Sequence, residues 1–193
     1  MIVSIGTEVY LALAKGPLTT AESSGLPFPG HIIIITIAHT PISSSTEAAE
    51  MDDYQSRLTK FFSENGCHAV TWEIRHNEGV HAHRQVVAVP QSKLLEDAFI
   101  EGFAEKKMVL EKREPGESEE YCRVVLPSGS FVATLPPRFD LQLPRRILAK
   151  VLDVEERMDW RSCIQDEEEE KADGLTFRNT FETAGVTQQQ QSA

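Results

Sequence analysis

The chain of 193 residues has little cysteine and no long apolar run, and each absence excludes a class of protein. Its three cysteines lie far apart and form no CxxC pair, so we expect neither a disulfide framework nor a cysteine zinc site. This usage indicates a reducing compartment. The longest apolar run, HIIIITI, has the length of a strand, so we expect no membrane-spanning helix. The N-terminus also lacks the positive segment of a signal peptide.

Positive charge is scarce as well, since the formal net charge is −11. This balance works against non-specific binding of nucleic acid over the whole surface. The acidic residues are concentrated in QDEEEEKADG (165–174), however, and several arginines and lysines lie elsewhere. A local basic groove therefore stays open as a possibility.

The pattern of residues 1–110 predicts the order β-β-β-α-β-β and then a second helix over about 93–107. HIIIITIAHT is typical of a strand buried on both faces. Ser44 and Glu47 fit a capping box that opens the first helix, and Asn65-Gly66 ends it. HAVTWEIRH and HAHRQVVAVP lie close enough in sequence to pair as antiparallel strands.

Composition changes at 111–120, which is charged and contains Pro-Gly. We expect residues 111–193 to form a smaller α+β module, with a hairpin, a helix that begins near Pro144, and a disordered polar tail at 187–193. TFRNTFETA fits either a helix or a strand. The predicted class is α+β, with an antiparallel sheet and covering helices in 1–110 and the smaller module packed against it.

The stretch GVHAHRQVVAVP carries the chemistry of most interest. Alternate residues of a strand share a face, so His81, His83 and Gln85 are expected on one side and Arg84 on the other. A neutral imidazole is a nucleophile near pH 7 and can attack phosphorus, while a neighbouring amide can donate to a phosphate oxygen.

An H-x-H pair in a strand is also compatible with a simple surface pair. Two histidines on one face suit zinc, but no third ligand is evident, and we predict neither a metal nor a cofactor. Gln85 cannot give up a proton, which favours binding, group transfer or slow hydrolysis over rapid hydrolysis.

The order of PGHIIIITIAH, a capped helix, a strand and H-x-H-x-Q resembles the histidine-triad (HIT) superfamily. Its nucleotide hydrolases carry H-x-H-x-H, and its galactose-1-phosphate uridylyltransferase branch carries H-x-H-x-Q. IVSIGTEVYLALAKGPLT, HAHRQVVAVP and the distal DWRSC are similar to the C-terminal region of the CwfJ family, which is associated with the spliceosome and with lariat debranching.

The resemblance implies roles for individual residues. His83 matches the nucleophile of catalytic relatives, His81 the first histidine and Gln85 the third position, while His31 matches an outlying supporting histidine. On the residues alone, His31 can equally be just the start of a strand. Phosphate or nucleic-acid contacts are expected from side chains with spare donors, namely Asn77, Arg84, Lys15, Arg145 and Arg146.

Three functions follow from these observations. The first is a nuclear splicing-associated module that acts with intron-lariat RNA and with the debranching enzyme or spliceosome components through a phosphate-compatible histidine site. The second is a nucleotidyl hydrolase or transferase with His83 as nucleophile. The third is a protein-contact role for the acidic run and the C-terminal module, with vestigial histidines.

Overall fold

The computed structural model describes residues 1–76 and 81–183, and its seven described strands form one antiparallel sheet. The strand order is β1-β2-β3-β5-β4-β6-β7, which confirms the expected antiparallel sheet. β5, the strand that contains His83, is an inner strand between β3 and β4, and its antiparallel pairing with β4 is as expected. The strands are β1 (Ile2–Ile5), β2 (Val9–Leu13), β3 (His31–Thr36), β4 (Cys67–Arg75), β5 (His83–Pro90), β6 (Tyr121–Leu126) and β7 (Gly129–Thr134).

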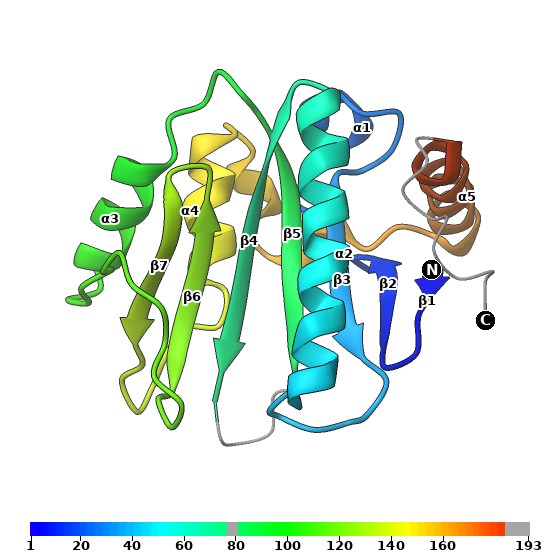
Figure 1. Cartoon of the computed structure of the whole chain (residues 1–193). Helices are drawn as coiled ribbons and strands as arrows, with labels where there is room; N and C mark the ends of the chain where they lie inside the picture. The colour runs from blue at the N-terminus through cyan, green and yellow to red at the C-terminus, as the bar shows by residue number, and fades with distance from the viewer. Residues whose placement is uncertain (77–80, 184–193) are drawn as a thin grey trace.

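Helices cover both faces of the sheet (Figure 1). One apolar cluster lies between the sheet and α2 and α5, and the second lies between the sheet and α3 and α4. Val86 and Ala88 of β5 belong to the first cluster, whereas Val87 and Val89 belong to the second, as strand alternation requires. The helices are α1 (Ala21–Ser24), α2 (Ser45–Glu64), α3 (Glu96–Ala104), α4 (Leu143–Val151) and α5 (Glu167–Thr183).

The predicted capping box of the first long helix is confirmed. Ser44 Oγ accepts a hydrogen bond from the Glu47 N–H at 3.2 Å, and the Glu47 carboxylate accepts from the Ser44 N–H at 2.6 Å. Both contacts satisfy N–H groups that have no partner within the helix. The helix ends at Asn65, and Gly66 takes the positive φ of 75° that the turn requires. A short helix that we did not predict, α1, lies in the Ser/Gly/Pro segment before β3.

Residues 111–183 extend the same sheet, where we expected a smaller module packed against it. β6 pairs with β4 in antiparallel register, so Trp72 lies opposite Val124. β6 and β7 form the predicted hairpin, which turns between Leu126 and Gly129. The two parts share one sheet, so the sheet itself marks no boundary at residue 110. The proposed division there stays a prediction.

One sequence ambiguity is resolved in the C-terminal part. Residues 176–183, the described part of TFRNTFETA, belong to α5, which begins within the acidic run and buries Phe177 and Phe181 against the first cluster. Trp72 of β4 is a core residue, and only 2% of its surface is exposed. Trp160 is half-buried in a 3₁₀ turn (Trp160–Cys163). None of the described helices combines the length and the apolar character needed to cross a bilayer.

Candidate functional site

The histidine row is shorter than alternation predicted, because β5 begins at His83 and His81 precedes it. The imidazole of His81 instead contacts the end of β3. Its Nε2 lies 3.0 Å from the Thr36 hydroxyl and 2.9 Å from the Ala38 carbonyl oxygen, and its ring stacks on His39 with centroids 4.5 Å apart. His81 therefore supports the site through its main chain, as the contacts of His83 show.

A directional chain of hydrogen bonds runs through the other three polar residues. The Leu18 N–H donates to His31 Nδ1 at 3.0 Å, and His31 Nε2 lies 3.1 Å from Gln85 Oε1. Gln85 Nε2 lies 3.3 Å from His83 Nε2. His83 Nδ1 lies 2.7 Å from the His81 carbonyl oxygen. The chain thus begins at a backbone donor and ends at a backbone acceptor.

These two fixed ends determine every proton between them. Since the Leu18 N–H is a donor, His31 Nδ1 accepts, and the proton of this imidazole sits on Nε2, which donates to the Gln85 oxygen. The Gln85 amide nitrogen therefore faces His83 and donates to its Nε2. The proton of neutral His83 is left on Nδ1, where the His81 carbonyl accepts it.

Burial keeps both imidazoles neutral. Burial, followed by the charge of Arg145, lowers the pKa of His31 from 6.5 to about 3. Burial also lowers the pKa of His83, although its bond to the His81 carbonyl opposes this effect. His83 is still half-exposed, so a solute can reach it. The site presents an unprotonated Nε2 beside an amide donor near neutral pH.

Arg84 lies on the opposite face, as alternation predicted, and its donors are engaged there. Its guanidinium donates to Glu73 and to Asp52 of α2, at 2.6 Å in each case, and to Gln55 at 3.1 Å. Tyr121 also donates to Glu73, at 2.9 Å. This network, in which Arg84 is buried and Asp52 is exposed, joins α2 to β4, β5 and β6, so Arg84 has a structural role in the sheet.

The other predicted phosphate contacts are dispersed. Lys15 is exposed beyond the end of β2, and Arg146 is exposed on α4 and paired with Asp140. Arg145 is buried and donates to main-chain carbonyl oxygens, including that of Gly16 at 2.9 Å. Asn77 lies outside the described residues. Of the predicted site residues, the structure brings together His31, His81, His83 and Gln85.

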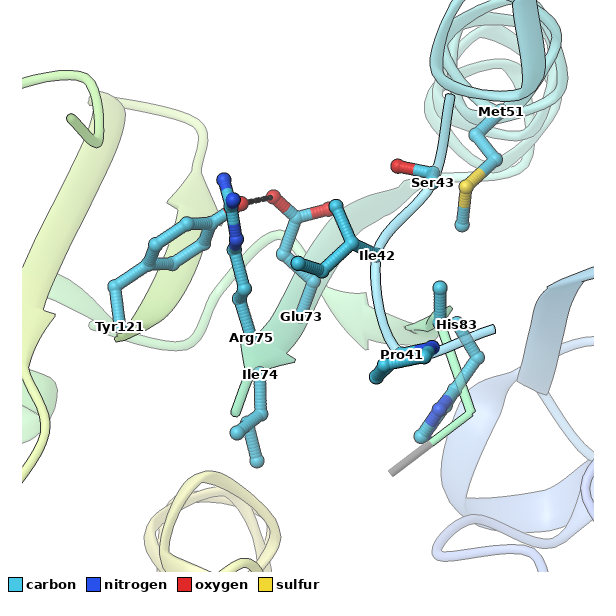
Figure 2. A pocket seen from close by; sticks show the side chains of 10 residues that line it. Pro41, Ile42, Ser43, Met51, Glu73, Ile74, Arg75, His83 and Tyr121 are labelled. Atoms are coloured by element: carbon cyan, nitrogen blue, oxygen red, sulfur yellow. Dashed lines mark hydrogen bonds between the residues drawn. The ribbon is translucent and has the colours of Figure 1, made fainter. Parts of the chain in front are cut away.

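A small pocket opens beside His83 at the end of the sheet (Figure 2). Its volume of about 70 Å³ is well below the roughly 300–1,000 Å³ of typical small-molecule pockets, and it lies on the Arg84 face of the sheet, away from the Gln85 amide. Glu73, Arg75 and Ser43 also line it, while the His83 ring extends away from Met51 and Ser43. Among the described residues, no group of three or more His, Cys, Asp and Glu side chains is arranged to hold a metal ion.

Two contributors to the site were missed from the sequence, and so was Arg75, which lines the small pocket on the opposite face of the sheet. Thr36 binds His81, and Leu18 supplies the N–H that fixes His31. The Leu18 contribution carries no sequence signal, because a main-chain N–H is present at every residue except proline.

Two family descriptions match the chain. "Protein similar to CwfJ C-terminal" matches residues 1–100, and "Protein similar to CwfJ C-terminus 2" matches residues 82–187. The chain of hydrogen bonds from Leu18 to His81 falls entirely within the first of these matches. The second match begins at residue 82 and therefore shares β5 with it.

Individual relatives match over nearly the full chain. CWF19-like protein mug161 of Schizosaccharomyces pombe is 39% identical, and CWF19-like protein 1 of Mus musculus is 32% identical; each match covers 97% of this chain and 36% of the relative. CWF19-like protein DRN1 of Saccharomyces cerevisiae is 27% identical over 97% of this chain and 44% of its own length. The chain thus spans less than half the length of these relatives. With one match over more than half of its residues and relatives above 30% identity, the chain belongs to the CwfJ family.

Proposed function

We propose that this chain is a splicing-associated, nuclear module of the CwfJ type that binds a phosphate group of intron-lariat RNA at His83 and Gln85. The observation that carries the proposal is the directional chain of hydrogen bonds from Leu18 to His81. It orients an amide N–H and a neutral imidazole toward one another in a half-exposed position. An incoming phosphate oxygen can accept a hydrogen bond from the Gln85 amide N–H without any change of protonation.

His83 and Gln85 are half-buried, which suits contact with one phosphate of a larger molecule. The small pocket that His83 helps to line lies on the opposite, Arg84 face of the sheet, and both Glu73 and Arg75 line it, so it adds no net positive charge to the site. With a net charge of −11, binding that depends on a defined site is favoured over binding by the whole surface.

Branched RNA tests this proposal directly. We expect a short 2′,5′-branched oligoribonucleotide to bind the wild-type chain more tightly than its linear isomer, as measured by fluorescence anisotropy at several salt concentrations. His83→Ala should weaken binding, whereas the control His68→Ala, at a half-exposed histidine of β4, should not. Equal binding by wild type and His83→Ala would exclude His83 as the phosphate contact.

The partner in this proposal is the lariat-debranching enzyme or a spliceosome component. Its support is membership of the CwfJ family, whose resemblance implies that setting. The purified debranching enzyme is expected to retain the intact chain in a pull-down. Failure of retention, with branched-RNA binding intact, would remove the partner and leave the RNA site.

A second function, nucleotidyl transfer or hydrolysis, is favoured by the tautomer of His83. Its Nε2 carries the lone pair, and Nδ1–H is held by the His81 carbonyl. In the reaction, Nε2 would attack a nucleotide phosphorus, forming a P–N bond while the P–O bond to the leaving group breaks and the leaving group departs as an oxyanion. Water would then cleave the P–N bond and regenerate His83.

The two functions give different results with nucleotide substrates. A fluorogenic adenylate and a UDP-sugar would be turned over by the enzyme, with an acid-labile adduct on His83 detectable by intact-mass measurement. Turnover that is abolished by His83→Ala supports catalysis. Branched-RNA binding without turnover supports the binding module.

A further inference from the structure

Two arginines from the C-terminal part bind three successive carbonyl groups next to the histidine chain. Arg145 Nη1 donates to the Gly16 oxygen at 2.9 Å. Arg157 donates to the Pro17 oxygen through Nη2 and to the Leu18 oxygen through Nε, both at 2.9 Å. Arg145 also donates to the Arg157 carbonyl oxygen, at 2.7 Å from Nη2, so the two residues support one another. We call segment 16–18 the strap.

The strap lies directly against the start of the 3₁₀ turn Trp160–Cys163. A Cβ at Gly16 would come within 2.0 Å of the Trp160 carbonyl oxygen, so no other residue fits there without a shift of main chain. Pro17 restricts the strap further because its ring fixes φ. The position of the strap is therefore set by its contacts with Arg145, Arg157 and Trp160.

The strap acts on His31 through a single peptide group. The Pro17 carbonyl and the Leu18 N–H belong to the same planar, trans unit, so they point in opposite directions. Arg157 binds the carbonyl side, and His31 Nδ1 accepts from the N–H side. Fixing the oxygen fixes the direction of the N–H, and the arginine charge also polarises the group and strengthens its donation.

We propose that Arg157, held by Arg145, is a positioning residue that sets the tautomers of His31 and His83 from the C-terminal part of the chain. Its effect on RNA or nucleotide rests on the proposed function, whereas its effect on the tautomers does not. Without the hydrogen bond from Arg157 to the Pro17 carbonyl, the direction of the Leu18 N–H is no longer fixed, and His31 Nδ1 is no longer forced to accept from it. Gln85 is then free to turn its amide, and His83 Nε2 can carry a proton.

Charge supports this assignment as well. Arg145 is buried, and its donors meet carbonyl oxygens and the sulfur of Cys163. Its positive charge disfavours a second positive charge on His31, in the same direction as burial does. The other titratable group that acts on His31 is His83, which also disfavours protonation. All three influences maintain the neutral ring that orients Gln85.

Histidine nitrogen NMR tests the proposal on the intact chain. Uniformly ¹⁵N-labelled wild type is compared with Arg157→Met, with Arg157→Lys, and with the control Arg178→Met. Arg178 also donates to two carbonyl oxygens, those of Ile2 and Val3, but beside β1. The signals are assigned with His31→Gln and His83→Gln.

We expect wild type to show the Nε2–H form of His31 and the Nδ1–H form of His83. Arg157→Met should give mixed tautomers at both and raise the pKa of His83 toward the ordinary 6.5, while Arg178→Met should resemble wild type. Arg157→Lys keeps the positive charge but lacks the planar guanidinium that binds two carbonyl groups. Its tautomers are therefore expected to lie between those of wild type and Arg157→Met. Branched-RNA affinity should fall roughly two- to thirtyfold in Arg157→Met.

Each outcome decides one point. Unchanged tautomers in Arg157→Met, with a wild-type circular dichroism spectrum, would overturn the proposal. If Arg157→Met is unfolded, Arg157→Lys gives the same test. Wild-type tautomers in Arg157→Lys would overturn the role of the two guanidinium hydrogen bonds. If the tautomers respond but wild type binds no RNA and turns over no nucleotide, the positioning role stands and the proposed function fails.

Discussion

Acid should destabilise this protein through one buried residue, His31. Its pKa in the folded chain is about 3, against 6.5 for an ordinary histidine, because burial and the Arg145 charge disfavour the imidazolium. Between these two values the unfolded chain binds a proton that the folded chain does not. Stability is therefore complete above pH 6.5 and is lost as the pH falls toward 3.

The size of the loss follows from the two pKa values. From pH 7 to pH 5, protonation of His31 in the unfolded chain alone removes about 2 kcal/mol of unfolding free energy. The groups that face His31 are Arg145, which lowers the pKa further, Gln85, which raises it through the hydrogen bond, and His83, which lowers it. None of them reverses the sign.

Urea unfolding at pH 7 and pH 5 measures this quantity. His31→Gln keeps a donor toward Gln85 and removes the titration, so its loss between the two pH values should be smaller than that of wild type by about 2 kcal/mol. The control, His68→Gln on β4, should lose as much as wild type. Equal losses for wild type and His31→Gln would refute the assignment of a buried neutral imidazole.

Three further perturbations probe other parts of the structure. Arg84→Met removes the guanidinium that Glu73 and Asp52 share and leaves half-buried Glu73 with Tyr121 and Arg123, so it should destabilise the chain by roughly 1–3 kcal/mol in urea unfolding; an unchanged free energy of unfolding would contradict a structural role for Arg84. Ser44→Ala removes the α2 cap and should cost about 1 kcal/mol, with Ser56→Ala on the same helix as the control. Burial raises the pKa of the Cys122 thiol, so a thiol reagent at pH 8 should modify Cys122 only after unfolding, as peptide mass mapping would show.

Local patterns predicted most of the fold because local physics determines it. The capping box at Ser44 and Glu47, the turn at Gly66 and the alternation of β5 each depend on neighbours in sequence. The short helix α1 was missed because its signals, Ser, Gly and Pro, are those of a loop. The pairing of β4 with β6 was missed because nothing in either strand identifies its partner.

The candidate site was predictable in its residues but not in its connections. The H-x-H-x-Q pattern located His83 and Gln85, and Arg84 was correctly placed on the opposite face. Arg145 and Arg146 look alike in sequence, yet one is buried and the other exposed. The spacing along the helix distinguishes the two arginines, because Arg145 lies three residues before buried Leu148 and therefore shares its side of α4.

The inner position of β4 in the sheet limits how this protein can be divided. One of its edges pairs with β5 and the other with β6, so cutting the chain near residue 115 separates strands that are hydrogen-bonded neighbours. The shorter fragment would present Val124 and Phe131 to water, and the longer one would present an unpaired β4 beside Trp72. Unpaired strand edges of this kind tend to pair with strands of other molecules. Fragment studies of either half would therefore report on self-association, and truncating mutations in this interval should act through aggregation.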